Sequence, residues 1–149
     1  MRGLAAIVIA LGMAAGGSLA AHQNADSPGQ PAHRTVWDGL YSETQAVRGK
    51  AVYMKACAEC HAPDLGGHEY AGALAGFGFQ LKWQDASLAE VYGRVRSMPL
   101  GAAGSLTGQE YLDIVAYILQ ANGYPAGGDD LSAAVAAQRW PRILIERQK

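Results

Sequence analysis

The strongest constraint on this chain is that its only two cysteines, Cys57 and Cys60, stand three residues apart and are followed directly by His61. Two cysteines can form a disulfide, act as a redox-active C-x-x-C pair or take part in a zinc site. The sequence C-x-x-C-H is also the attachment sequence for c-type haem. Each use predicts different surroundings for the motif.

The surroundings favour haem attachment. A redox C-x-x-C pair opens a helix that follows a strand, whereas here the pair closes an expected helix and no strand pattern precedes it. A structural zinc site needs four ligands, and the other histidines are scattered without a matching pair: His22, His33 and His68. Cysteines three apart on a helix share a face, which suits two adjacent vinyl groups. We therefore interpret Cys57 and Cys60 as thioether links to one covalent haem c, with His61 as the proximal iron ligand.

The length and composition of the chain fit a single domain whose core includes a haem. The chain has 149 residues and a formal net charge of −1, so we expect one core and no nucleic-acid partner. Glycine occurs 19 times and phenylalanine only twice, so large apolar side chains are scarce. A buried macrocycle would supply apolar area that the side chains lack.

The first residues predict export. Arg2 precedes the apolar run 3–15, and Ser18-Leu19-Ala20 offers small residues for cleavage. We expect a signal peptide over 1–20 and a periplasmic protein without a membrane span. The alternative is an uncleaved anchor, because an apolar stretch over 3–21 is just long enough to cross a bilayer. Residues 21–36 are rich in Pro, Gly, Gln and Ser and predict a flexible leader.

Helix signals dominate the next part of the chain. Capping boxes are expected to open three helices, at Ser42–Gln45, Ser87–Glu90 and Thr107–Glu110. Apolar residues at helical spacing follow each box: Gly49, Val52, Tyr53 and Ala56; Leu88, Val91, Tyr92 and Val95; Tyr111, Ile114, Val115 and Ile118. Apolar and polar residues never alternate for long enough to indicate a β-strand. The pattern predicts an all-α domain over 37–123.

The helix ends are also marked. Pro99 disfavours helical geometry at the residue before it, so the second helix should stop near Ser97. Asn122-Gly123 ends the third with residues that tolerate the left-handed conformation. Residues 124–149 are expected to form a tail with one short helix within 131–139. Its apolar run 143–145 either packs back on the domain or meets a partner.

Two stretches resemble the class I c-type cytochromes: Gly49-x-x-x-Tyr53-x-x-x-Cys57-x-x-Cys60-His61 and Asp113-Ile114-Val115-Ala116-Tyr117-Ile118. The resemblance covers about 37–123 and implies helices packed around one haem c. It also implies that the first and last helices cross closely at Gly49, with Tyr53 and Tyr117 beside the crossing. A glycine inside a helix costs about 1 kcal/mol against alanine, so a packing reason for Gly49 is expected.

The family also has a usual support for the proximal histidine. In most relatives a proline precedes the run that matches 73–76, and its carbonyl accepts the histidine N–H. Here Gly72 stands in that position. Any residue has a carbonyl, so we expect the bond to His61 to survive, without the rigidity of proline.

The family's distal ligand is usually a methionine before a proline, which Met98-Pro99 matches. Elimination favours the same residue. Met1 and Met13 lie in the expected signal, and Met54 is expected to fill the core on the proximal side. His68 follows His61 too closely to cross the haem plane, and the two remaining histidines lie in the leader.

Ligation by Met98 has a functional consequence. A thioether raises the reduction potential relative to two-histidine ligation. With both axial positions filled, the iron has no open site, and the remaining chemistry is outer-sphere electron transfer. We therefore interpret the protein as a single-electron carrier and not an enzyme. Trp83 is a candidate donor of its indole N–H to a haem propionate.

Three further stretches resemble small cytochromes that are found beside, or fused to, quinoprotein dehydrogenases: 36–42, 105–111 and 121–125. This resemblance implies electron uptake from such a dehydrogenase and delivery towards a terminal oxidase, by a monomer or a subunit of a hetero-complex. Docking at the haem edge is expected to use a rim of small apolar residues such as Ala58, Ala62, Pro63 and Leu100. Two alternatives stay open: an open-site haem sensor or weak peroxidase without Met98 ligation, and a structural haem subunit of a larger oxidoreductase.

Overall fold

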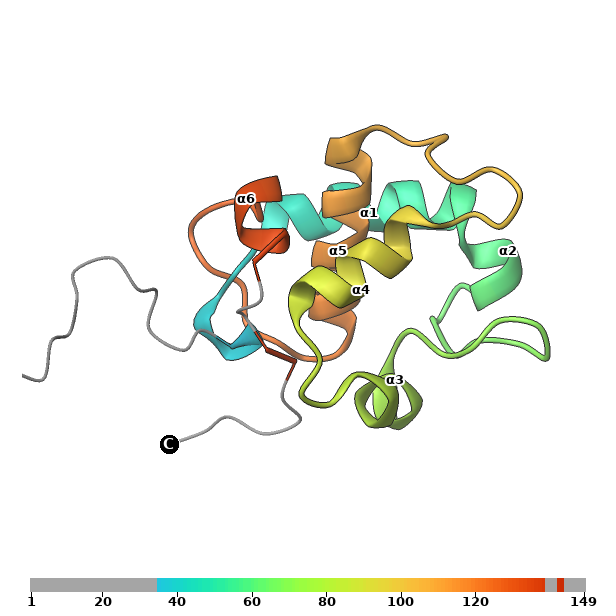
Figure 1. Cartoon of the computed structure of the whole chain (residues 1–149), viewed down its shortest axis with the longest axis horizontal. Coiled ribbons are helices and arrows are strands. Elements are labelled where there is room, and N and C mark those ends of the chain that lie inside the picture. Colours follow the sequence, from blue (N-terminus) through green and yellow to red (C-terminus); the bar gives the residue numbers. More distant parts are fainter. Residues whose placement is uncertain (1–34, 139–141, 144–149) are drawn as a thin grey trace, which may run out of the picture. The chain divides into compact units, whose positions relative to one another are not determined.

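Helices make up the regular structure of residues 35–138 and 142–143, the part of the chain that the computed structural model describes (Figure 1). They are η1 (Val36–Asp38), α1 (Glu43–Ala56), α2 (Ala58–His61), α3 (Gly76–Trp83), α4 (Leu88–Arg96), α5 (Gly108–Ala121) and α6 (Ala133–Ala136). Within these residues β-pairing is limited to isolated bridges. The expected all-α fold is confirmed. No helix in the described part combines the length and apolar character needed to cross a membrane.

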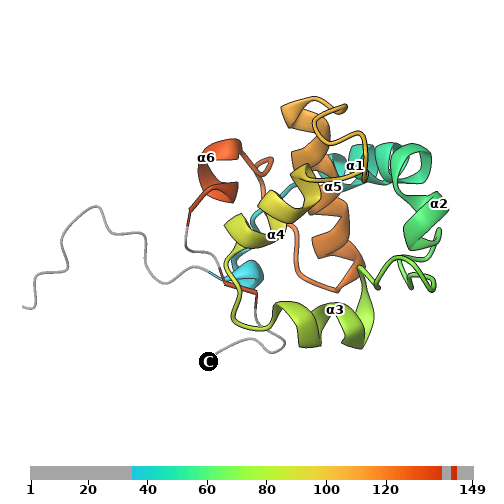
Figure 2. The ribbon, with the colours of Figure 1, turned by 45° about the vertical axis from the view of Figure 1, so that its right-hand side comes forward.

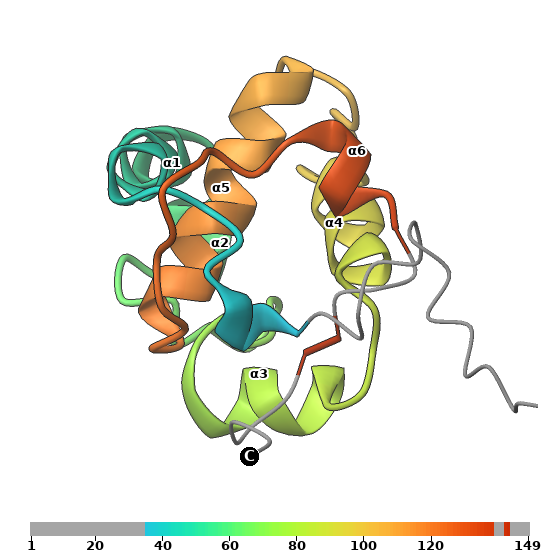
Figure 3. The same cartoon turned by 90° about the vertical axis from the view of Figure 1, so that its left-hand side faces the viewer.

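The central element is α5. Its residues 111–119 are all buried, because α1 packs against one side of it and α4 against another, as Figure 3 shows. The expected buried positions, such as Tyr111 and Ile118, are confirmed. The sequence pattern predicted a single apolar stripe, however, whereas the whole middle of the helix is enclosed. That burial extends even to Asp113, which is 4 % exposed.

Two of the three expected capping boxes are present. Ser87 and Thr107 each accept a backbone N–H three residues on, and the glutamate at that position bonds back. At the start of α1 the prediction of a capping box was wrong. Ser42 does accept from the N–H of Gln45 at 3.1 Å, but the Gln45 side chain turns to the backbone of Leu131 instead. Its amide donates at 3.1 Å and accepts at 2.6 Å there.

The expected ends of α4 and α5 agree with the structure. Ser97 is the residue that caps α4. At the end of α5 Gly123 adopts the left-handed conformation with φ 79°, whereas Asn122 does not, with φ −90°. The Asn122 side chain instead bonds the start of α3, accepting from Gly76 N at 3.0 Å and donating to Leu74 O at 2.9 Å. Figure 2 shows the chain passing from α2 along α3 to α4 around this end of α5.

The crossing of α1 and α5 depends on Gly49. A Cβ atom at this position would overlap the backbone carbonyl of Asp113 and would lie 3.0 Å from Cβ of Tyr117. Beside it the rings of Tyr53 and Tyr117 pack with centroids 5.4 Å apart. The expected close crossing is confirmed, and it leaves no room for any side chain at Gly49.

The C-terminal segment, 124–138 with 142–143, packs on several elements of the domain. Its helix α6 contacts α4 and α5, and residues 142–143 bond the backbone of Val36 and Ala86. Tyr124, Leu131 and Ile143 are buried, at 2 % exposure or less. The helix expected within 131–139 is the short α6. Leu144, Ile145 and Arg139 lie outside the described residues, as do the expected signal 1–20 and residues 21–34 of the leader.

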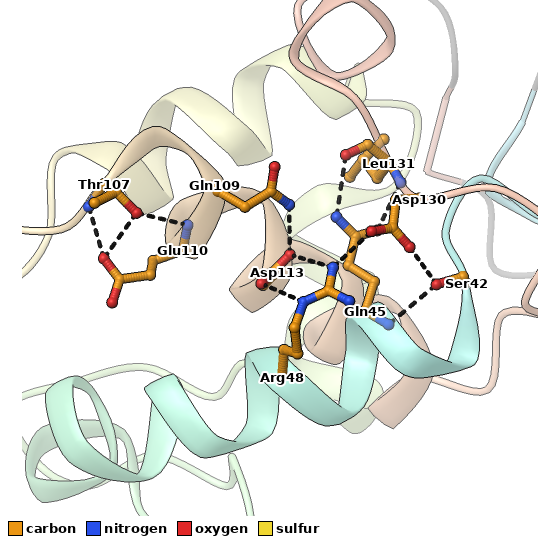
Figure 4. Close-up of polar contacts among 9 residues, drawn as sticks. All are labelled: Ser42, Gln45, Arg48, Thr107, Gln109, Glu110, Asp113, Asp130 and Leu131. Carbon is orange, nitrogen blue, oxygen red and sulfur yellow. Dashed lines mark hydrogen bonds and ion pairs between the residues drawn. The ribbon is translucent and has the colours of Figure 1, made fainter.

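A polar network fastens the segment to α1 and α5 (Figure 4). The Arg48 guanidinium pairs with Asp113 at 3.0 Å and with Asp130 at 2.6 Å. Gln109 donates to Asp113 at 2.7 Å, and the Ser42 hydroxyl donates to Asp130. The bonds from Ser42 and Arg48 hold the pKa of the Asp130 carboxyl below its usual value. One guanidinium thus joins three parts of the chain.

Candidate haem site

The C-x-x-C-H motif lies across a helix break. Cys57 ends α1 and begins α2, with φ −127° and ψ −30°, while Cys60 and His61 belong to α2. The sequence placed the pair at the end of one helix, so the break is a correction. The backbone N–H groups of Cys60 and His61 both donate to the Cys57 carbonyl, at 3.2 and 2.9 Å. One tight turn therefore gathers all three residues.

Both cysteines are free thiols, Cys57 half-buried and Cys60 exposed. Burial raises the pKa of the Cys57 thiol, and the neighbouring Cys60 adds to the shift. Among the described residues no group of three or more His, Cys, Asp and Glu side chains could hold a metal ion. The described residues therefore offer no set of ligands for a zinc site. The two cysteines are not joined by a disulfide, so both sulfur atoms are available to form thioethers.

His61 is oriented by a backbone carbonyl. Its Nδ1 lies 2.8 Å from the carbonyl oxygen of Gly72. A carbonyl only accepts, so Nδ1 donates its N–H here, and Nε2 is the ring nitrogen left to bind a metal. The expected bond between the His61 ring and the Gly72 carbonyl is confirmed. The turn between the two is closed by Gly67, whose N–H donates to the His61 carbonyl at 3.0 Å with φ 79°.

We expect Gly72→Pro to raise the free energy of unfolding by about 0.4–1 kcal/mol, because proline restricts the unfolded chain. A Cβ at Gly72 would meet nothing within 4 Å, its φ lies outside the left-handed region, and no backbone bond from its N–H is lost. The carbonyl that binds His61 is unchanged. Urea unfolding of wild type, Gly72→Ala and Gly72→Pro measures the effect. Destabilisation by proline but not by alanine would show that the native backbone at Gly72 is incompatible with proline.

Tyr53 has a second role that the sequence interpretation missed. Its hydroxyl donates to the carbonyl of Ala62 at 2.6 Å and lies 3.2 Å from the carbonyl of His61. Burial raises the pKa of this hydroxyl, so it remains a proton donor. The sequence did contain an indication of this role. A tyrosine at a fully buried position needs a hydrogen-bond partner for its O–H, whereas a phenylalanine does not.

Met98 lies on a separate loop between α4 and α5 and is partly buried. Its N–H donates to Val95 O at 3.0 Å, and its carbonyl accepts from the Tyr111 hydroxyl at 2.9 Å. The expectation that Met54 fills the core was wrong. Met54 is 45 % exposed, because it falls on the side of α1 that faces away from α5.

Trp83 ends α3 and is partly buried. Its ring lies 6.5 Å from that of Phe79, and Lys82 Nζ lies 5.4 Å above it. On another face of the same helix Phe77 and Leu81, one turn apart, are 73 % and 67 % exposed. This helix is not among the closely packed helix pairs of the described chain. An apolar face is thus left uncovered on α3.

Comparison with known proteins adds one match. Residues 44–118 match the family model described as "Cytochrome C oxidase, cbb3-type, subunit III". The matched range is about half of the chain and runs from the first turn of α1 into the last turn of α5. It includes the C-x-x-C-H turn, Gly72 and Met98. No curated protein and no solved structure matches the chain.

Proposed function

Because the chain belongs to the cytochrome c family whose model is that of the cbb3-type oxidase subunit III, we propose that it carries single electrons on one haem c held by Cys57 and Cys60. Membership of this family implies haem c and electron transfer. The finer assignments are part of the proposal: thioether links to both cysteines, His61 as the proximal ligand and Met98 as the distal ligand.

The observation that carries the proposal is the bond between His61 Nδ1 and the Gly72 carbonyl at 2.8 Å. A histidine that ligates a metal ordinarily donates its other ring N–H to a carbonyl or carboxylate, which fixes the tautomer and ring orientation. Here that support is present, and the ring's free nitrogen is the one that would ligate. The same turn carries both free thiols.

The apolar surface of the domain also fits a haem. Four large apolar side chains between the motif and the start of α5 are strongly exposed: Tyr70, Phe77, Leu81 and Leu100. A haem adds apolar area to a domain whose own side chains supply little, which supports the fit.

When bound, haem c supplies a one-electron couple between ferric and ferrous iron. His61 and Met98 would hold that iron from two different segments of the chain, α2 and the loop after α4. A thioether ligand favours the ferrous form and so raises the reduction potential. With His61 and Met98 as its two ligands, the iron would have no position for a substrate, and the chemistry that the group would supply is outer-sphere electron transfer.

We propose an exported, periplasmic carrier that takes electrons from a quinoprotein dehydrogenase and passes them towards a terminal oxidase. The family's description as an oxidase subunit supports the acceptor side. The expected docking rim needs correction. Ala58 and Ala62 are 7 % and 6 % exposed and cannot contact a partner, which leaves Pro63 and Leu100 at the surface.

A pyridine haemochrome assay with a reduced-minus-oxidised spectrum tests the proposal. We expect one thioether-linked haem per chain, and slow carbon monoxide binding to the reduced protein. Met98→Ala should open the iron and make binding fast, because the sixth ligand is removed. Met54→Ala is the matched control, since Met54 lies exposed on α1, and should behave as wild type. Ready binding of carbon monoxide to the wild type would contradict the carrier assignment and favour the open-site sensor.

A further inference from the structure

Two buried tyrosine hydroxyls bond the backbone at the two residues proposed as iron ligands. Tyr53 of α1 is 0 % exposed and Tyr111 of α5 is 3 % exposed. The first contacts the carbonyls of His61 and Ala62, and the second contacts the carbonyl of Met98. Both tyrosines come from the pair of helices that forms the crossing, so each ligand segment is tied to one of the two helices that meet at Gly49.

The bond from Tyr53 supports a strained stretch of backbone. Ala62, directly after the proximal histidine, has φ 64°, in the left-handed region that side chains other than glycine rarely adopt. Its carbonyl accepts from the Tyr53 hydroxyl at 2.6 Å and from Leu65 N at 3.1 Å. The His61 carbonyl accepts in the same way from Gly67 N at 3.0 Å. The hydroxyl therefore sits at the point where the chain leaves α2.

The bond from Tyr111 closes the loop that follows α4. Its hydroxyl donates to the Met98 carbonyl at 2.9 Å and accepts from Gly104 N at 2.9 Å. One oxygen therefore joins the two ends of the stretch 98–104 and fastens both to α5. The buried hydroxyl is fully used, because it donates one bond and accepts one.

We propose that Tyr53 and Tyr111 are positioning residues for the axial ligands, each fixing the backbone of one ligand residue through its hydroxyl. This inference rests on the proposed function, since it needs His61 and Met98 to ligate the iron. A ligand on a fixed backbone returns to the iron after each dissociation, whereas a ligand on a loosened segment is displaced more readily. The tyrosines act through His61 and Met98 and need not touch the haem.

The test uses the full-length haem protein with Tyr53→Phe and Tyr111→Phe. Both changes keep the ring and remove only the hydroxyl. The matched control is Tyr124→Phe, because the Tyr124 hydroxyl is buried and bonds nothing in the described part of the chain. The first readout is the rate at which imidazole displaces the methionine from ferric protein. Loss of one hydrogen bond corresponds to about a tenfold change, so we expect Tyr111→Phe to react about tenfold faster than the control.

The second readout is amide hydrogen exchange, which distinguishes the effect of the Tyr53 hydroxyl from that of the Tyr111 hydroxyl. Tyr111→Phe should speed exchange at Gly104, whose N–H loses its acceptor. Tyr53→Phe should speed exchange at Leu65 and Gly67, whose acceptors are the carbonyls that Tyr53 holds. Each variant should leave the other's amides unchanged. Tyr53→Phe should also move the NMR resonances of the His61 ring, whereas the control Tyr124→Phe should leave them unchanged.

Failure of this inference is distinguishable from failure of the proposed function. Wild-type ferric protein without the weak far-red absorption of a methionine–iron bond would refute Met98 ligation, and with it the role given to Tyr111. With that band present, equal imidazole rates and equal exchange in Tyr111→Phe and Tyr124→Phe would overturn the role of Tyr111. An unchanged His61 resonance and unchanged exchange at Leu65 and Gly67 would overturn the role of Tyr53.

Discussion

Gly49→Ala is expected to destabilise the domain by about 3 kcal/mol or more. The added Cβ would overlap the backbone carbonyl of Asp113, which cannot move aside as a flexible side chain could. The two helices must therefore separate, and the packing of Tyr53 on Tyr117 is lost with them. Domains of this size are stable by only about 5–15 kcal/mol. Urea unfolding followed by circular dichroism measures the loss.

The matched control is Gly93→Ala on α4. Gly93 is also inside a helix, but it is exposed and a Cβ there would meet nothing within 4 Å. Alanine should stabilise this position by about 0.5–1 kcal/mol, because glycine costs that much in a helix interior. Stability changes of opposite sign at the two glycines would show that contact with α5, and not helix propensity, determines the effect of alanine at Gly49. Equal effects would contradict the close crossing.

Truncation after Gly123 is expected to leave the chain without a stable native state. The deletion keeps the whole range that matches the family, 44–118, but removes Tyr124, Leu131 and Ile143 from the core. Full burial of one large apolar side chain contributes about 1.5–3 kcal/mol, so the loss is roughly 5 kcal/mol or more. It also removes Asp130, the exposed partner of Arg48. Near-UV circular dichroism and thermal unfolding would report the missing tertiary structure.

Point variants separate packing from chain length. Leu131→Ala should cost about 2–5 kcal/mol, as expected for a large-to-small change at a buried position. Val47→Ala is the control, because Val47 is 65 % exposed on α1 and should change stability little. A truncated chain that melts as cooperatively as the full chain would show that residues 124–149 are dispensable.

The sequence predicted the elements whose signals are local. Ser87 and Thr107 start their helices with reciprocal boxes, because the bonded groups are only three residues apart. Gly49 was recognised because a glycine inside a helix needs a reason, and the resemblance to a known family named the crossing. The role of the Gly72 carbonyl followed in the same way, and the bond to His61 is present.

Long-range partners escaped the sequence interpretation. Gln45 looked like the last member of a capping box, but Leu131, 86 residues away, provides better partners for a buried amide. The helix α3 was missed because Gly76 and Gly78 weaken its local propensity, and its N-cap residue, Ala75, has no side chain that could cap it. The bond to its first N–H comes from Asn122, 46 residues away. The hydroxyls of Tyr53 and Tyr111 were overlooked because helical periodicity treats tyrosine only as an apolar ring.

The network around Arg48 joins residues that are far apart in the sequence. Arg48 and Asp113 are 65 residues apart, and Gln45 and Leu131 are 86 apart. Contacts between such distant residues form late, because a long loop must close first. We therefore expect this network to close after the local helices have formed. Under the proposed function, this late step does not limit covalent attachment, because Cys60 is exposed and Cys57 is only half-buried in the folded chain.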